Sequence, residues 1–148
     1  MGTTAKDFFT QQEQTEIKNA ILSAELDTSG EIRVHIENNF QGDVLDRAAF
    51  VFKQLDMNKT ELRNGVLIYL AIKKRQFAII GDKGINAVVP EDFWDSIKSK
   101  MVEHFRENRF AEGLKEAIGN TGIHLKSHFP RSKADVNELR DDISFGKD

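Results

Sequence analysis

Polar and apolar residues alternate strictly along residues 31–37, whereas residues 66–72 form an unbroken apolar run. Alternation is typical of a strand with one buried face, and a short apolar run rich in branched residues is typical of a strand buried on both faces. Lys73 to Arg75 predict a solvated turn, after which the apolar residues from Phe77 to Ile80 predict a third strand at 76–80, antiparallel to the second. The pattern therefore predicts a hairpin preceded by a separate strand with one charged face.

Four stretches have the 3.6-residue spacing of amphipathic helices. Thr10 and Glu13 have the spacing of a capping box, so the first helix should begin there. The second should begin at Asp43, between the first two strands, and a right-handed crossover then makes these strands parallel. Pro90 suits the first position of the third helix, and a last helix should carry the apolar residues from Phe110 to Leu125 and end at Pro130. We therefore expect an α/β fold, a three-layer α/β/α sandwich whose mixed sheet of three to four strands has helices on both faces.

The chain divides into three parts by its pattern. Residues 1–9 form an N-terminal segment, and residues 10–129 carry all the predicted helices and strands. Residues 130–148 have few apolar groups and many charges, so we expect a mobile C-terminal tail that contributes nothing to the core.

Composition narrows the class of protein. The chain has 148 residues, of which 39% are hydrophobic and 30% charged, as in one ordinary globular domain. The net charge of -3, with Lys and Arg interspersed among acids, indicates no nucleic-acid partner. The absence of Cys excludes disulfides and thiolate metal sites. The apolar runs are too short for membrane insertion, and the polar start lacks the apolar region of a secretory leader, so we expect a cytoplasmic protein.

Three breaks in the pattern should meet at one end of the sheet. They are Ser29-Gly30, Asn64-Gly65 and Gly81-Asp82. The crossover places the starts of the first two strands side by side, and the hairpin brings the end of the third strand to the same place. We expect a divalent cation there, calcium more readily than magnesium, because irregular loop ligands suit its flexible coordination. The candidate ligands are Asp82, Glu31, Asp27, Asn64, Glu91 and Asp92. The alternative is that these residues serve only turns and helix ends.

Four segments, three of which contain these breaks, carry a resemblance to a known family. They are Thr28-Ser29-Gly30-Glu31-Ile32, Asn64-Gly65-Val66-Leu67, Gly81-Asp82-Lys83-Gly84-Ile85 and Phe105-Arg106-Glu107-Asn108-Arg109-Phe110. In this order and spacing, from about Phe9 to Phe129, the chain resembles the TPM domain family, whose members include thylakoid-lumen proteins linked to photosystem II repair and bacterial membrane-tethered proteins. The resemblance implies an α/β/α sandwich, calcium-type binding of a divalent metal and, for some plant members, acid phosphatase activity.

The chain departs from the family pattern at the candidate site. Arg63 stands where the family often has Asp beside Asn-Gly, which exchanges a possible metal ligand for a cation, although Asp82 could restore the carboxylate nearby. Two functions of different class follow. The first is a cation-binding or interaction module without turnover. The second is a weak metal-assisted acid phosphatase, in which Arg63 and Lys83 would stabilise the phosphoryl oxygens.

Other polar groups have simpler explanations. Asn38, Asn39, Asp43 and Asp46 flank the other end of the first strand, where we expect an Asx turn and a helix cap. His124 and His128 have a spacing that zinc uses but no third ligand nearby. His35 should lie on the exposed face of its strand or under a covering helix, without a catalytic role. The chain contains no Gly-x-Ser-x-Gly, P-loop or His-Glu-x-x-His motif.

Overall fold

The computed structural model describes residues 4–26, 28–131 and 143–146. A four-stranded sheet in the order β3-β2-β1-β4 lies at its centre. The strands are β1 (Glu31–Glu37), β2 (Gly65–Ala71), β3 (Gln76–Gly81) and β4 (Ser144–Phe145). The helices are α1 (Ala5–Phe8), α2 (Gln11–Glu25), α3 (Val44–Gln54), α4 (Lys83–Asn86), α5 (Phe93–Arg106) and α6 (Phe110–His128), with a short 3₁₀ turn, η1 (Met57–Lys59).

The sheet has the predicted mixed topology. Strands β1 and β2 run parallel from the pair Glu31 and Gly65, whereas β2 and β3 form the antiparallel hairpin. All seven residues of β2 are buried, as expected for a central strand covered on both faces.

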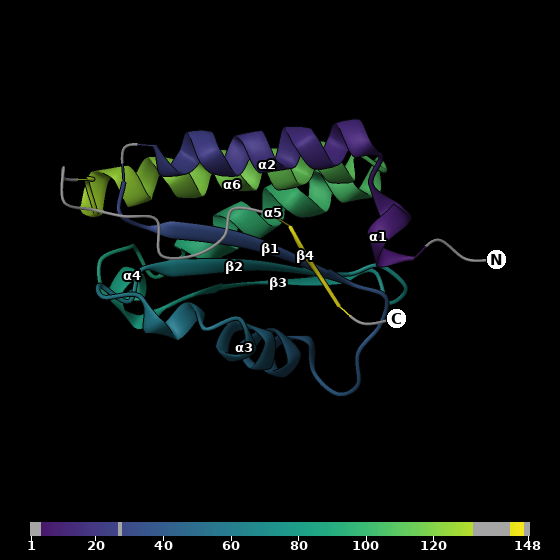
Figure 1. Cartoon of the computed structure of the whole chain (residues 1–148), viewed down its shortest axis with the longest axis horizontal. Helices are drawn as coiled ribbons and strands as arrows, with labels where there is room; N and C mark the ends of the chain where they lie inside the picture. The colour runs from purple at the N-terminus through teal and green to yellow at the C-terminus, as the bar shows by residue number, and fades with distance from the viewer. Residues whose placement is uncertain (1–3, 27, 132–142, 147–148) are drawn as a thin grey trace.

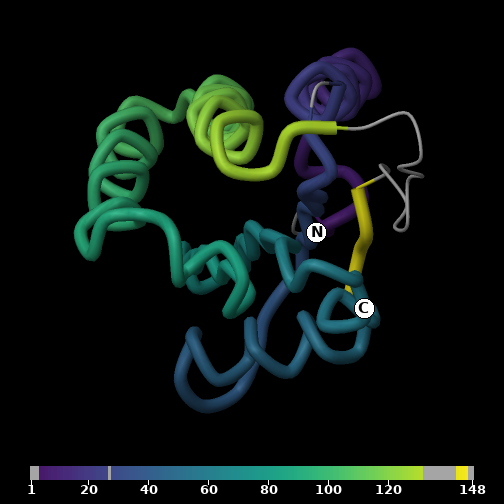
Figure 2. Tube along the Cα trace, turned by 90° about the vertical axis from the view of Figure 1, so that its left-hand side faces the viewer, coloured from purple at the N-terminus to yellow at the C-terminus, as the bar shows by residue number. Residues whose placement is uncertain are grey.

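Helices cover both faces of this sheet, which confirms the three-layer α/β/α sandwich. Figure 1 shows α2, α5 and α6 above the sheet and α3 below it, and the turned view of Figure 2 shows the same separation. The alternation along β1 and β2 divides the core accordingly. Ile32, Val34 and Val66 belong to the cluster under α2, α5 and α6, whereas Leu67 and Tyr69 belong to the cluster beside α3.

Side-chain caps mark the first residues of α2 and α3. The hydroxyl of Thr10 accepts the Glu13 amide at 3.0 Å, and Glu13 Oε1 accepts the Thr10 amide at 2.9 Å, which completes the predicted capping box. Asp43 caps α3 by accepting the Leu45 amide at 2.9 Å. The prediction that Pro90 opens the next helix is wrong, because α5 begins at Phe93 after a turn in which the Phe93 amide bonds to the Pro90 carbonyl.

The C-terminal segment differs from the prediction. Ser144 and Phe145 pair in parallel with β1, opposite His35 and Ile36. Ile143 and Phe145 are half-buried against the larger core cluster, so the prediction that this segment contributes nothing to the core is wrong for these two residues. A two-residue strand is too short to leave a periodic signal, and its partner strand is far away in sequence. The mobility predicted for residues 132–142 and 147–148 concerns positions outside the described residues.

Candidate functional site

The glycine-rich breaks meet at one end of the sheet, as the sequence predicts. The hairpin register pairs Val66 with Gly81, and the Asp82 amide donates to the Gly65 carbonyl at 2.9 Å. On the other side of β2, the Glu31 amide donates to the Asn64 carbonyl at 3.3 Å. Asn64 and Asp82 therefore lie at the same edge, where β1 and β2 begin and β3 ends.

Asp82 is a buried carboxylate held by an arginine. Its side chain is only 6% exposed, and Arg63 donates to it twice, from Nε to Oδ2 at 2.7 Å and from Nη2 to Oδ1 at 3.0 Å. Oδ1 also accepts the Lys83 amide at 2.8 Å, so Asp82 begins α4. The hydrogen bond to Asp82 is the main cause of a raised pKa of the Arg63 guanidinium. This cation occupies the position at which the sequence predicts a metal ion.

The backbone around Arg63 is constrained. Arg63 has a φ of 51°, in the left-handed region that non-glycine residues seldom adopt. The Gly84 amide donates to the Arg63 carbonyl at 2.8 Å, and a Cβ on Gly84 would collide with the carbonyl oxygens of Leu62 and Arg63. Glycine at 84 thus allows the two loops to touch, and this contact aims Arg63 at Asp82.

The other predicted ligands are dispersed. Asn64 is buried, and its side-chain Nδ2 donates to Ser29 Oγ at 3.3 Å. Glu31 is buried on β1. Glu91 and Asp92 are exposed in the turn before α5, and Asp27 lies outside the described residues. Over residues 4–26, 28–131 and 143–146, no three acidic or histidine side chains are grouped as they would be around a metal ion. The described side chains therefore do not form a ready-made calcium shell.

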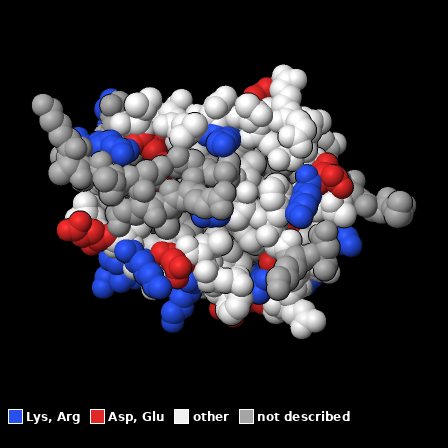
Figure 3. Space-filling model, in the orientation of Figure 1, with Lys and Arg blue, Asp and Glu red and all other residues white. Residues whose placement is uncertain are grey.

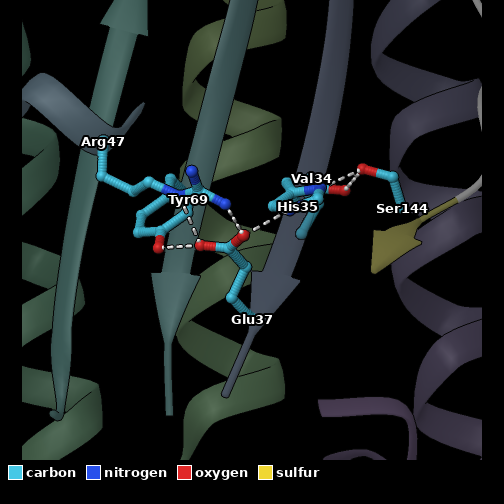
Figure 4. A network of polar contacts seen from close by, with 6 residues as sticks. All are labelled: Val34, His35, Glu37, Arg47, Tyr69 and Ser144. Atoms are coloured by element: carbon cyan, nitrogen blue, oxygen red, sulfur yellow. Dashed lines mark hydrogen bonds and ion pairs between the residues drawn. The ribbon is translucent and has the colours of Figure 1, made fainter. Parts of the chain in front are cut away.

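A second polar group, which the sequence did not predict, lies at the opposite end of β1. The carboxylate of Glu37 is bound by Arg47 from α3, with Nε at 3.0 Å and Nη2 at 2.5 Å, and by the hydroxyl of Tyr69 on β2. His35 Nε2 lies 3.5 Å from Glu37 Oε1, and His35 Nδ1 lies 2.7 Å from Ser144 Oγ on β4 (Figure 4). Side chains from four elements thus form one chain of polar contacts.

Burial and pairing set the charges of this group. Burial alone would raise the pKa of Glu37, but the hydrogen bonds from Arg47 and Tyr69 outweigh it and lower that pKa. Burial, together with the Glu37 charge, raises the pKa of Tyr69. Burial also lowers the pKa of His35, against the opposing effect of Glu37. The group therefore contains an ionised Glu37–Arg47 pair and a histidine that resists protonation.

One sequence signal could have pointed to this group. Tyr69 is the only residue with a polar side chain in the apolar run at 66–72, and a fully buried tyrosine hydroxyl needs a partner. The pattern could not identify Glu37 as that partner, since the pairing depends on the register of two strands.

The remaining candidates serve the backbone or the core. Asn38 Oδ1 accepts the Ala5 amide at 2.6 Å, and Asn39 Oδ1 accepts the amide of Phe40 at 2.9 Å. His124 Nδ1 lies 3.2 Å from the Asn120 carbonyl, and its ring packs against Phe93. His35 is buried, with only 5% of its surface exposed.

The surface shows no segregation of charge on the face drawn in Figure 3, where Lys and Arg side chains lie close to Asp and Glu side chains. Among the described helices, none has the length and apolar content that crossing a bilayer requires.

Comparison with known proteins places the chain in a family. The BA42 protein of the psychrophilic bacterium Bizionia argentinensis has a similar solution structure, with 46% identity, a TM-score of 0.89 and coverage of 95% of this chain and 97% of that chain. The N-terminal domain of a protein from P. gingivalis has 21% identity and a TM-score of 0.67 over 82% of this chain and 79% of that one. The N-terminal domain of the cg2496 protein from Corynebacterium glutamicum has 15% identity and a TM-score of 0.65 over 88% of this chain and 81% of that one. These last two show a shared fold only.

A search of curated proteins found no significant match. The family model of the TPM domain matches residues 3–122, which cover the sheet end around Arg63 and Asp82 as well as five of the six α-helices in the described part of the chain in full. This chain belongs to the TPM domain family.

Proposed function

We propose that this chain is a calcium-type cation-binding module that acts by binding, without turnover, and that Asp82 is its principal ligand. The observation that carries the proposal is the buried Asp82 carboxylate at the glycine-rich sheet end, whose counter-ion is a partly exposed arginine side chain. A buried carboxylate needs a cation or several hydrogen-bond donors, and here Arg63 supplies both.

Exchange of one cation for another is the physical basis of the proposal. The Arg63 side chain is 35% exposed, so it can turn into solvent. The Asp82 side chain is only 6% exposed and would stay buried. A divalent ion would then meet the Asp82 carboxylate beside the carbonyls of the loop, which are the hard oxygen ligands that calcium takes. Because the ion has to compete with Arg63, the affinity in this proposal is low. Calcium is favoured over magnesium, since magnesium demands a near-ideal octahedron.

The alternative is a weak metal-assisted acid phosphatase. It requires Arg63 or Lys83 to contact phosphoryl oxygens. The two hydrogen bonds from Arg63 to Asp82 favour the binding module, because they use the guanidinium edge that a phosphate would need. Lys83 is exposed beside it and remains the cation that this alternative would use. A cytoplasmic location, without nucleic-acid or membrane partners, is part of the proposal.

A titration monitored by amide NMR tests the proposal. Calcium and magnesium are added separately to the wild type and to Arg63→Asn, a variant that removes the guanidinium while asparagine tolerates the left-handed backbone. We expect calcium to shift the amides of residues 29–31, 63–65 and 81–84, with an affinity at least threefold higher in Arg63→Asn. Asp82→Asn should lose the response, and the matched control Asp43→Asn, at the opposite end of the sheet, should keep it.

Two results would contradict the proposal. Millimolar calcium that leaves these amides unmoved in both the wild type and Arg63→Asn would show that the site does not exist. Hydrolysis of a phosphate monoester by the wild type, abolished in Arg63→Asn or in Lys83→Ala, would favour the phosphatase instead.

A further inference from the structure

The outer edge of β1 has only a short length available for pairing. The Ile32 amide donates to Glu25 Oε2 at 2.6 Å, so a side chain from α2 already satisfies that backbone group. The carbonyls of Val34 and Ile36 are bound instead by residues of the C-terminal segment, at 3.3 Å from Ser144 Oγ and 2.9 Å from the Gly146 amide. An unsatisfied strand edge attracts another strand, and here the accepting length is limited to Val34–Ile36.

The serine of the segment is recognised from two sides. Its hydroxyl oxygen lies 3.3 Å from the Val34 carbonyl oxygen and 2.7 Å from His35 Nδ1, so it contacts a backbone acceptor and the imidazole ring at once (Figure 4). His35 itself is stacked on the Tyr69 ring, with ring centroids 6.0 Å apart, and is buried, so its position is set by the sheet. An alanine at position 144 would leave the Val34 carbonyl and His35 Nδ1 without the hydroxyl that contacts them.

The glycine of the segment is selected by shape. A Cβ on Gly146 would collide with Cγ of Glu37 and would lie 2.8 Å from its Oε1. A flexible side chain could move away, but Glu37 is held by Arg47 and Tyr69. The polar group at this end of β1 therefore fixes the wall that excludes larger residues.

The aromatic residue between them is only partly covered. Phe145 is half-buried against the larger core cluster, and a cleft of about 490 Å³ lies between the segment and α2, lined in part by Gln14, Lys18 and Phe145. The segment thus has specific contacts at Ser144 and Gly146, and between them an aromatic side chain that is only half-buried.

We infer that the β1 edge at Val34–Ile36 is a strand-recognition site for a Ser–aromatic–Gly segment, occupied by residues 144–146 of the same chain and open to exchange with that segment of a second copy. Main-chain hydrogen bonds supply the affinity, and His35 and Glu37 supply the selectivity, as in other recognition by strand addition. The identical sequence of the second copy makes its segment complementary to this edge. The site lies at the opposite end of β1 from Asp82, so it stands independently of the cation proposal.

The test uses full-length Gly146→Val, in which the collision with Glu37 disables the chain's own segment while the edge stays intact. The probe is a peptide with the sequence of residues 140–148, added to the isotope-labelled variant. We expect saturable shifts of the Val34, His35 and Ile36 amides. A peptide with Ser144→Ala should bind at least threefold more weakly, and a peptide with Gly146→Val should not bind. The wild-type chain should bind the native peptide at least tenfold more weakly, because its tethered segment competes at high effective concentration.

The outcomes against the inference are distinct. Unmoved β1 amides, or equal binding of all three peptides, would show that no such recognition exists. Equal binding by the wild-type chain and Gly146→Val would show that the chain's own segment does not occupy the edge. For the second copy, sedimentation after refolding at a concentration on the order of a millimolar should detect dimers of the wild type and none of Gly146→Val. A wild type that stays monomeric there would overturn the second copy as the occupant.

Discussion

The side chains of Arg63 and Asp82 join the start of β2 to the end of β3 through two hydrogen bonds of 2.7 and 3.0 Å. A forked guanidinium–carboxylate contact of this kind fixes orientation as well as distance. At this sheet end it ties together two loops that also touch through Gly84. The contact therefore stabilises the hairpin ends and, in the proposed function, competes with a divalent ion for the same carboxylate.

Removal of either partner of this pair should lower the melting temperature. Arg63→Asn leaves the buried Asp82 carboxylate without its guanidinium, whereas Asp82→Asn leaves a half-exposed arginine that water can solvate. We therefore expect the larger decrease for Arg63→Asn. Thermal unfolding of both single variants and the double variant checks this, and a double variant that melts as low as the sum of the two decreases would show that the pair is not coupled.

Shortening a central core side chain should be costly. Leu67 on β2 is fully buried beside α3, and Leu67→Ala should lower the free energy of unfolding by about 2–5 kcal/mol, since it leaves a cavity. Leu62, 51% exposed, provides the control, because Leu62→Ala should change the free energy of unfolding by less than about 0.5 kcal/mol. Urea denaturation measures both values, and similar losses in the two variants would contradict the central position of β2.

The hydroxyl of Tyr69 should contribute measurably to stability. Tyr69→Phe keeps the ring but removes the donor to the buried Glu37 carboxylate, which should cost about 1.5–3 kcal/mol in the free energy of unfolding. The same change should raise the pKa of Glu37, because one of the bonds that lower it is lost. Carboxyl NMR titration reads that pKa directly. An unchanged pKa would show that Arg47 alone determines the charge state of Glu37.

Mild acid should weaken the fold through His35. The pKa of buried His35 lies below its ordinary value of 6.5, so the unfolded chain binds the proton more readily. The stability that neutral His35 contributes is then fully present above about pH 6.5 and is lost as the pH falls below that value. The groups that face it are Glu37 and Arg33 on β1, Arg47 on α3, Tyr69 on β2 and Ser144 on β4.

Urea denaturation of the wild type at pH 7.5 and pH 5.5 should therefore show a lower free energy of unfolding at pH 5.5. His35→Gln, which cannot take up a proton, should show a smaller difference between the two pH values. A wild type with no loss at pH 5.5, or a variant with the same loss, would assign the pH response to other residues.

Much of the fold could be predicted from local patterns. The alternation at 31–37 and the apolar run at 66–72 predicted β1 and β2 because a buried face imposes a period on the residues next to each other in the chain. Thr10, Glu13 and Asp43 predicted two helix starts, because a cap is satisfied within one turn of backbone. Turn chemistry likewise predicted the hairpin, and therefore the meeting of Asn64 and Asp82 at one sheet end.

The contacts that give the two sites their character depended on the tertiary structure. Arg63 was expected to repel a metal or to bind phosphate, and only the folded loops show that its partner is Asp82. Glu37 and Tyr69 are 32 positions apart, and His35 and Ser144 are 109 apart. Local periodicity cannot predict contacts between residues so far apart in the chain. Strand register and the docking of a two-residue strand are decided by packing across the whole sheet. Sequence thus determined which segments become helices and strands, whereas the tertiary structure decided which polar side chains meet, because each buried polar atom takes the partner that packing brings within reach.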